Sequence, residues 1–247
     1  MNPTHSSRAS KTTPWNTAFF ETILTTFPKD IRPIYIPFSR LRGSPEFFIR
    51  RAVFISITTP MQDMMLSVKE SLLVKKTVYR HFRIDEKTSI PEKLSCLYIA
   101  REGNSRQILN EESLLKNLTR LFHDISINKR FFGKLSFEEQ VQLMSKTDIV
   151  FGIHGAAFIN VLFMRPKSGL IEYFSPVFSA TYYETISRKS YILYSSIKDN
   201  VVSKKDKKVL KDKRNANLNV SIRSSINKFR IMISQVWEEK YKSVPLV

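Results

Sequence analysis

From residue 94 onward, short apolar runs alternate with stretches in which apolar residues recur every three or four positions. The short runs predict buried strands, and the longer spacing predicts amphipathic helices. We expect strands at residues 94–100, 125–127, 148–153, 169–174 and 191–195. We expect helices at residues 111–122, from 136 onward, from 157 to before 166, at 180–188 and at 221–241. Strands that alternate with helices are typical of βαβ units, so the predicted fold class is α/β, with a Rossmann-like parallel sheet and helices on both faces.

The first 90 residues show a less regular pattern. Prolines interrupt it at positions 3, 14, 28, 33, 37, 45 and 60, and proline breaks helices and central strands. We expect short strands at 34–38 and 53–57 and a helix at 63–79, but no complete βα repeat. The predicted organisation is therefore an irregular or incomplete N-terminal region, 1–90, followed by a Rossmann-like domain, 91–247.

Charge adds a first indication of partners. The chain of 247 residues carries 40 Lys and Arg against 22 Asp and Glu, a formal net charge of +18. Such a surplus favours polyanions such as phosphates, nucleic acid or anionic membranes, and charge alone does not choose among them. Part of the surplus lies in the run 204–214, which is typical of a solvated loop. The single cysteine, Cys96, excludes an intrachain disulfide and a cysteine-based metal site.

The segments that follow the predicted strands carry the candidate chemistry, because ligands of parallel sheets bind at the carboxyl ends of the strands. His154, Gly155 and Ala156 follow the strand at 148–153 and open a helix. A small-residue turn at a helix start lets backbone amides approach an anion, and His154 can donate to a phosphate oxygen. The alternative is a tight turn in which Gly155 only relieves backbone strain.

Charged side chains follow two other predicted strands. Arg101 and Arg106 come after the strand at 94–100 and suit a bidentate clamp on a diphosphate. Ordinary surface charge is the alternative. Glu172, near the end of the strand at 169–174, suits the two hydroxyls of a ribose, unless it faces solvent.

Polar residues at two predicted helix starts form a second candidate group. Asn110 and Glu111 follow the arginines, and Asn110 has the alternative role of a helix N-cap. Ser136 and Glu139 have the spacing of a capping box, in which each side chain bonds the backbone amide of the other. Gln140 follows directly.

Several motifs are absent from the sequence. It contains no glycine-rich GxGxxG, no Walker-type loop, no HExxH and no Asp-X-Asp pair of the kind that holds a diphosphate through a metal. The charge of a bound diphosphate must then be met by arginine, histidine and backbone amides, so we expect no metal and no cofactor. Signals of RNA-recognition, zinc-finger or helix-turn-helix proteins are also absent, and we expect no nucleic-acid partner.

Taken in order, the candidate residues form the series Arg101, Arg106, Asn110-Glu111, Ser136 to Gln140, His154-Gly155-Ala156, Asn160 and Ile171-Glu172. The series resembles glycosyltransferase family 61, the group with the plant xylan-decorating enzymes and the animal protein O-linked N-acetylglucosaminyltransferases. The tail at 217–220 also resembles the end of the family pattern. The sequence departs from that pattern at Ala157, where the family usually has glycine.

The resemblance implies a two-domain GT-B architecture, inversion at the anomeric carbon and no essential metal. It implies transfer of a sugar from a nucleotide-diphosphate sugar, expected to be UDP-linked, to a hydroxyl of a protein or glycan; the catalytic base is not identified. The expected donor-binding residues are Arg101, Arg106, Asn110, Glu111, Ser136, Glu139, Gln140, His154, Gly155, Ala156 and Glu172.

Two alternatives from other classes stay open. One is a non-catalytic remnant or binding module of the same fold, motivated by the irregular N-terminal region, and the other is a basic nucleic-acid-binding protein, motivated by the net charge. The resemblance also implies the lumen of the endoplasmic reticulum or Golgi. No apolar run approaches the roughly 20 residues of a membrane span, and residues 1–16 lack the core of a signal peptide. On this interpretation, a membrane anchor would lie outside this chain.

Overall fold

The computed structural model of the protein describes residues 14–25, 67–86, 89–175, 178–198, 201–202 and 216–242. Its centre is a five-stranded sheet in the order β2-β1-β3-β4-β5. The strands are β1 (Leu94–Ile99), β2 (Ile125–Arg130), β3 (Ile149–Ile153), β4 (Gly169–Tyr173) and β5 (Leu193–Ile197). Every pairing between neighbouring strands of this sheet is parallel, which confirms the predicted α/β class.

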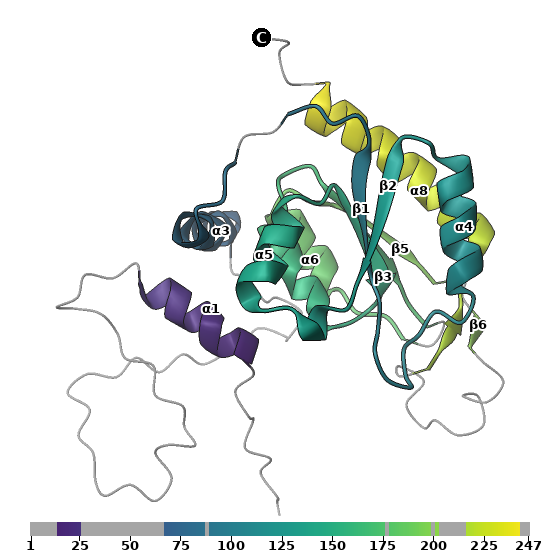
Figure 1. The fold of residues 1–247 in the computed structure, drawn as a ribbon, viewed down its shortest axis with the longest axis horizontal. Coiled ribbons are helices and arrows are strands. Elements are labelled where there is room, and N and C mark those ends of the chain that lie inside the picture. The colour runs from purple at the N-terminus through teal and green to yellow at the C-terminus, as the bar shows by residue number, and fades with distance from the viewer. Residues whose placement is uncertain are drawn as a thin grey trace, which may run out of the picture.

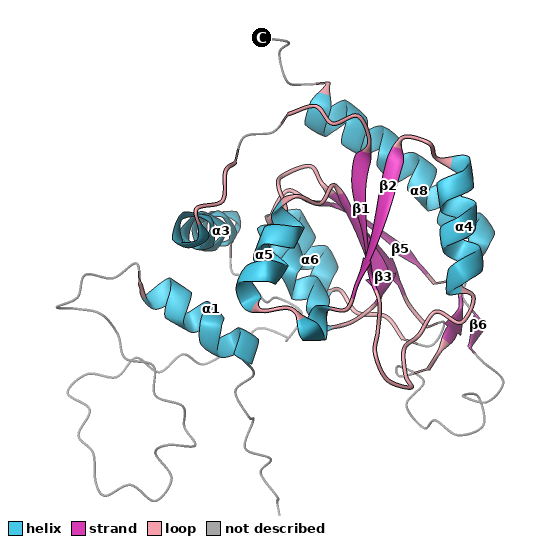
Figure 2. Cartoon of the chain, in the orientation of Figure 1, coloured by secondary structure: helices cyan, strands magenta, loops and turns pink. Residues whose placement is uncertain are grey.

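Helices cover both faces of the sheet (Figure 1). On one face lie α4 (Glu111–Leu121) and α8 (Ile222–Val236), which continues into the π-helical turn η4 (Trp237–Tyr241). On the other face lie α5 (Phe137–Ser145), α6 (Tyr182–Lys189) and the 3-10 helix η2 (Ala156–Phe163), and the short η1 (Phe132–Lys134) leads into α5. A small antiparallel pair, β6 (Val201–Val202) and β7 (Leu218–Asn219), completes the strands of the described residues (Figure 2).

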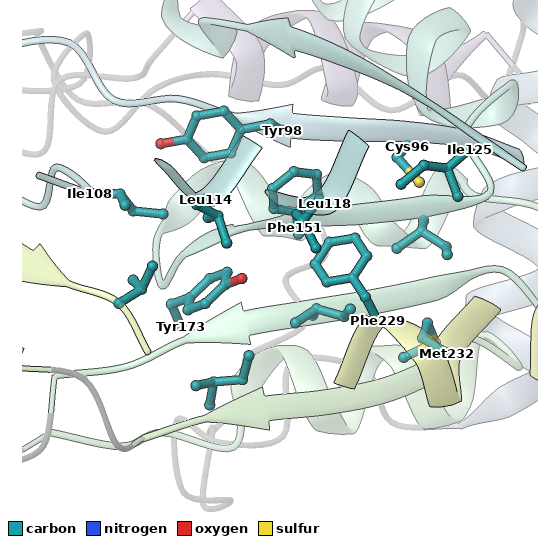
Figure 3. Close-up of a cluster of buried hydrophobic side chains, with 14 of the residues drawn as sticks. Cys96, Tyr98, Ile108, Leu114, Leu118, Ile125, Phe151, Tyr173, Phe229 and Met232 are labelled. Carbon is teal, nitrogen blue, oxygen red and sulfur yellow. The ribbon is translucent and has the colours of Figure 1, made fainter. Parts of the chain in front are cut away.

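Alternate side chains of the central strands reach two separate cores. Tyr98, Phe151 and Tyr173 point toward α4 and α8, where they meet Leu118 and Phe229 (Figure 3). The Phe151 and Phe229 rings pack edge to face with their centroids 5.0 Å apart. Residues of the opposite parity on the same strands face the other core: Leu97, Val150 and Leu170. Because both faces are buried, the strands appear in the sequence as continuous apolar runs, which makes them predictable.

Two helices precede the sheet and pack on the side of α5. One is α3 (Val68–Phe82), close to the helix predicted at 63–79. The other, α1 (Pro14–Leu24), was not predicted; Pro14 stands at its first position, which suits proline. The rings of Trp15 and Phe19 lie 5.1 and 6.0 Å from the ring of Phe137. The strands expected at 34–38 and 53–57 lie outside the described residues, and the division into 1–90 and 91–247 stays a prediction.

Some boundaries differ from those expected. The last strand of the sheet, predicted at 191–195, is Leu193–Ile197. Tyr191 adopts a left-handed φ of 56° after α6, and Ile197 pairs with Tyr173 of β4. The segment after β3, predicted as a helix, is a 3-10 helix. β2 is longer than predicted because its residues up to Arg130 pair with β1.

The strand order fixes where a ligand would bind. β1 lies between β2 and β3, so the chain leaves β1 in one direction and returns to its other side for β3. In sheets of this order, ligands bind outside the carboxyl ends of the strands at this reversal. The residues that follow β1 and β3, including Arg101 and His154, lie at that edge.

Candidate functional site

The segments after β1 and β3 meet through Arg101 and Gly155. Arg101 Nη2 donates a hydrogen bond of 3.1 Å to the carbonyl oxygen of His154. A Cβ at Gly155 would lie 1.2 Å from Arg101 Nη2, so the guanidinium rests directly on the glycine backbone. The φ of Gly155 is 174°, which any residue adopts. The glycine is therefore needed for close approach, and the alternative that it relieves backbone strain is wrong.

Arg106 places a second guanidinium beside that of Arg101, and three features of this arrangement cost free energy. Its backbone is left-handed, with φ 56°, a conformation that costs a non-glycine residue about 1–2 kcal/mol. Its buried Nε has no hydrogen-bond partner among the described residues. Burial, and then repulsion from Arg106, lowers the pKa of Arg101. Backbone strain, an unsatisfied buried donor and adjacent like charges gather at functional sites, and here they favour an anion.

His154 is held by a buried carboxyl group on the neighbouring strand. Its Nδ1 lies 2.6 Å from Oε1 of Glu172, and the Tyr194 hydroxyl donates to Oε2 at 2.9 Å. Glu172 is 0% exposed, so the alternative that it faces solvent is wrong. Burial raises the pKa of Glu172, although the hydrogen bonds from His154 and Tyr194 act in the opposite direction. His154 and Glu172 thus lie at the same end of the sheet, as predicted.

Aromatic rings surround the His154 side chain. The imidazole stacks on Phe174 with centroids 5.1 Å apart and an interplanar angle of 26°. The rings of Phe178, Tyr183 and Tyr182 follow at 5.1, 5.3 and 6.1 Å. His154 is only 4% exposed. Two fixed contacts, the carboxyl at Nδ1 and the stacked ring, therefore determine the orientation of the imidazole.

The loop that carries the arginines is pinned by the segment around β7. Leu109 N donates to Leu218 O at 2.8 Å, and Leu218 N donates to Gln107 O at 2.9 Å. The side chain of Asn110 bonds both backbone groups of Val220, at 2.8 and 2.9 Å. Asn110 stands at the N-cap of α4 but makes no capping bond there. Its role in the structure is to hold the arginine loop against the tail at 217–220.

Glu111 faces away from the arginines. Its side chain accepts from the Tyr98 hydroxyl at 3.0 Å and forms an ion pair with Lys129. Tyr98 belongs to the core under α4 and α8. Glu172, which bonds His154, lies on the other face of the sheet. The structure therefore does not bring Glu111 to the cluster of Arg101 and His154.

Ser136 and Glu139 form the predicted capping box at the start of α5. Glu139 N donates to Ser136 Oγ at 3.3 Å, and Ser136 N donates to Glu139 Oε2 at 2.7 Å. The backbone hydrogen bond from Ser136 lowers the pKa of Glu139. Both partners serve the helix terminus, so their geometry is explained locally.

Gln140 and Asn160 connect α5 to the segment after β3. Gln140 Nε2 donates to the carbonyl of Leu135 at 2.9 Å, and its Oε1 accepts from Asn160 Nδ2 at 2.9 Å. Asn160 in turn accepts from Trp15 Nε1 at 3.2 Å. This network fixes η2, whose first residue, Ala156, is exposed. Sequence reasoning missed Trp15 because nothing in its local pattern indicates a partner 145 positions away.

Within the described ranges, no group of three or more His, Cys, Asp or Glu side chains could hold a metal ion. None of the helices in the same ranges is both long and apolar enough to cross a membrane.

Comparison with known proteins bears on the same segments. The family model described as Glycosyltransferase 61 matches residues 12–171, more than half of the chain and a range that includes Arg101, Arg106 and His154. The EGF domain-specific O-linked N-acetylglucosamine transferase of Drosophila melanogaster is 29% identical over 84 residues. That match covers 34% of this chain and spans 16% of the length of the Drosophila protein. On the extent of the family match, this chain belongs to glycosyltransferase family 61.

Proposed function

We propose that the protein is an inverting glycosyltransferase that binds a UDP-linked sugar at the carboxyl edge of β1, β3 and β4. The observation that carries the proposal is the juxtaposition of Arg101 and Arg106. One guanidinium is partly buried beside the other, and the second has an unsatisfied buried donor. A diphosphate would supply both the negative charge and the acceptor oxygens that this arrangement lacks.

In this proposal the two arginines and the start of η2 stabilise the leaving diphosphate without a metal. A base takes the proton of the acceptor hydroxyl, whose oxygen attacks the anomeric carbon from the face opposite the diphosphate. The bond from that carbon to the diphosphate oxygen breaks and UDP leaves, so the configuration inverts. As the bond to the sugar breaks, negative charge grows on the diphosphate, and preorganised cations stabilise that charge most. Backbone amides near Gly155 and Ala156 and the dipole of η2 add to this effect.

His154 and Glu172 are proposed to act together on the donor. Glu172 holds the imidazole at Nδ1, which leaves Nε2 as the ring nitrogen for a phosphate oxygen. Because His154 is only 4% exposed, one of the surrounding aromatic rings would have to move for this contact to form. The Tyr194 hydroxyl donates a hydrogen bond to the other carboxyl oxygen of Glu172. A contact of Glu172 with the ribose would therefore require the Tyr194 side chain to move. We propose that Asn110, Gln140 and the capping residues contribute by positioning the segments that touch the donor.

The wider setting is also part of the proposal. Family membership supports a two-domain GT-B architecture, with the sheet domain as the donor-binding half, and a location in the secretory pathway. The Drosophila relative is named as an O-linked N-acetylglucosamine transferase specific for EGF domains. UDP-N-acetylglucosamine and a folded protein domain are therefore the first donor and acceptor to test.

Calorimetry with UDP-N-acetylglucosamine, with and without a chelator, tests donor binding. We expect the same affinity in both conditions, and UDP release when an EGF domain is added, with inversion visible by NMR of the product. Binding without turnover would support the alternative of a non-catalytic binding module. Absence of nucleotide-sugar binding, together with salt-dependent retention on DNA, would overturn the proposal.

Replacing Gly155 by alanine should weaken donor binding while leaving the fold intact. The added methyl group would occupy the position of Arg101 Nη2, and a flexible guanidinium can move away from it. Loss of one charge-assisted hydrogen bond costs about 1.5–3 kcal/mol, or at least about tenfold in affinity. Gly133→Ala is the matched control, because a Cβ there meets nothing within 4 Å. Equal affinities of the two variants for UDP would contradict the proposed role of Arg101.

A further inference from the structure

A second cationic site lies at the opposite edge of the sheet from the proposed donor site. It is a pocket of about 260 Å³ between α3, the turn before β4 and the C-terminal turn η4. Asp148, directly before β3, and the turn at 165–168, directly before β4, lie at the amino-terminal edge of the sheet. The C-terminal end of α8 lies at the same edge (Figure 1). The cations that line the pocket are Lys75, Lys76, Arg165, Lys167 and Lys240. Two acids, Glu86 and Glu239, also line it.

The inner wall of this pocket consists of cations whose positions are fixed. Lys75 Nζ donates to the carbonyl of Met164 at 2.7 Å. Lys240 Nζ donates to Asp148 at 2.6 Å and to Ser168 at 2.9 Å. Both lysines are buried, at 5% and 7% exposure, so their charges sit in a medium of low dielectric. Neither ammonium can swing away into solvent without breaking these bonds.

Arg165 contributes an unsatisfied donor to the same wall. Its Nη2 donates to Asp85 O at 3.2 Å, whereas its buried Nε has no hydrogen-bond partner among the described residues. Lys76 and Lys167 are exposed and stand at the rim. Five lining cations therefore face two lining acids and Asp148, the partner of Lys240, so positive charge is in excess. Burial lowers the pKa of Lys240, Asp148 acts in the opposite direction, and repulsion from Arg165 adds to the lowering, which a bound anion would offset.

We propose that this pocket binds a tetrahedral dianion, a phosphate or sulfate group of a ligand distinct from the sugar donor. Guanidinium and ammonium donors that converge from separate elements suit the oxygens of such a group, which accepts from several directions at once. The site is separate from the donor edge because its cations adjoin the starts of β3 and β4, whereas Arg101 and His154 follow the ends of β1 and β3.

The test is calorimetry of the full chain with inorganic phosphate, inorganic sulfate and, as a monoanion control, acetate. The Arg106→Ala variant serves as background, so that binding at the donor edge is weakened and contributes less. Lys76→Glu and Lys167→Glu should each weaken phosphate binding by at least about tenfold, because each removes a charge-assisted contact and adds repulsion. Both residues are exposed, so the variants should fold. Lys116→Glu on α4, outside this pocket, is the matched control and should change nothing.

Proton uptake provides a second readout that diffuse surface charge would not give. Burial lowers the pKa of Lys75 to about 8, although Glu86 acts in the opposite direction. At pH 8 its ammonium form is thus incompletely populated, and an adjacent dianion raises this pKa. Sulfate binding should take up roughly half a proton at pH 8, measured from heats in buffers of different ionisation enthalpy, and less at pH 7. Sulfate is the probe here because it stays a dianion at both pH values, whereas phosphate would release protons of its own.

The outcomes separate the proposal from its rivals. Phosphate or sulfate binding that is lost in the two rim variants, kept in Lys116→Glu and accompanied by proton uptake supports a built site. A preference for phosphate over sulfate assigns the ligand to the phosphate class, and the reverse assigns it to sulfate. Equal weakening by Lys116→Glu, binding of acetate as tight as phosphate, or no measurable binding of any of the three anions overturns the proposal.

Discussion

Replacement of Arg106 by alanine should weaken binding of a UDP-linked sugar at least about 30-fold. Removing one partner of a desolvated charge pair costs about 2–5 kcal/mol, and 2 kcal/mol corresponds to roughly 30-fold in affinity. An exposed arginine would contribute under about 1 kcal/mol. Arg106 belongs with the desolvated charges, because its buried Nε is unsatisfied and its charge lowers the pKa of Arg101.

The stability of the free protein should not fall with the donor affinity in Arg106→Ala, and this difference distinguishes a binding role of Arg106 from a structural one. Arg106→Ala removes an unsatisfied buried donor and the repulsion with Arg101, so the thermal midpoint of the free protein should not fall. Sites that hold charge for a ligand often gain stability when that charge is removed. Calorimetry with UDP-N-acetylglucosamine and thermal unfolding of the free protein give both quantities, with Lys116→Ala as the exposed control.

If the two arginines bind the diphosphate without a metal, a chelator should not change the effect of Arg106→Ala on affinity. The ratio of affinities between the unaltered protein and Arg106→Ala should be the same with and without chelator, because the guanidinium itself meets the phosphate charge. Equal small effects of Arg106→Ala and Lys116→Ala on affinity would contradict binding by the two arginines. Loss of binding by the unaltered protein when chelator is added would contradict it as well.

The parts of the fold that local pattern determines could be predicted from the sequence. β1, β3 and β4 were predicted because strands buried on both faces form continuous apolar runs. The capping box of Ser136 and Glu139 was predicted because its partners are three residues apart. The convergence of Arg101, Arg106, His154 and Glu172 followed from parallel topology, since carboxyl ends of parallel strands share one edge.

The parts that depend on distant partners could not be predicted. α1 carries a mixed set of aromatic residues whose buried side is defined by distant partners such as Phe137 and Asn160, more than 100 residues away. Tyr194 was not recognised because β5 starts two residues later than its apolar pattern indicates, and a strand tyrosine gives no sign of a carboxyl partner. The role of Asn110 required the position of Val220, which local pattern does not supply.

Replacement of Asp148 by alanine should destabilise the protein by about 3–5 kcal/mol, because it leaves the buried ammonium of Lys240 without its ion-pair partner. Asp148 also accepts from Ser95 N at 2.8 Å and from the Tyr241 hydroxyl at 2.5 Å, so η4 would lose its attachment to the start of β3. Chemical denaturation measures the loss in free energy of unfolding.

A second substitution shows whether the unpaired charge causes this loss. Adding Lys240→Met to Asp148→Ala should recover at least about 1 kcal/mol, since an apolar side chain of similar length has no charge to desolvate. Glu184→Ala, which breaks the exposed pair with Arg188, should cost under about 1 kcal/mol. If Asp148→Ala costs no more than Glu184→Ala, or Lys240→Met deepens the loss, the buried pair does not hold η4 to the sheet. Recovery in the double variant would instead assign most of the loss to one uncompensated cation at the amino-terminal edge.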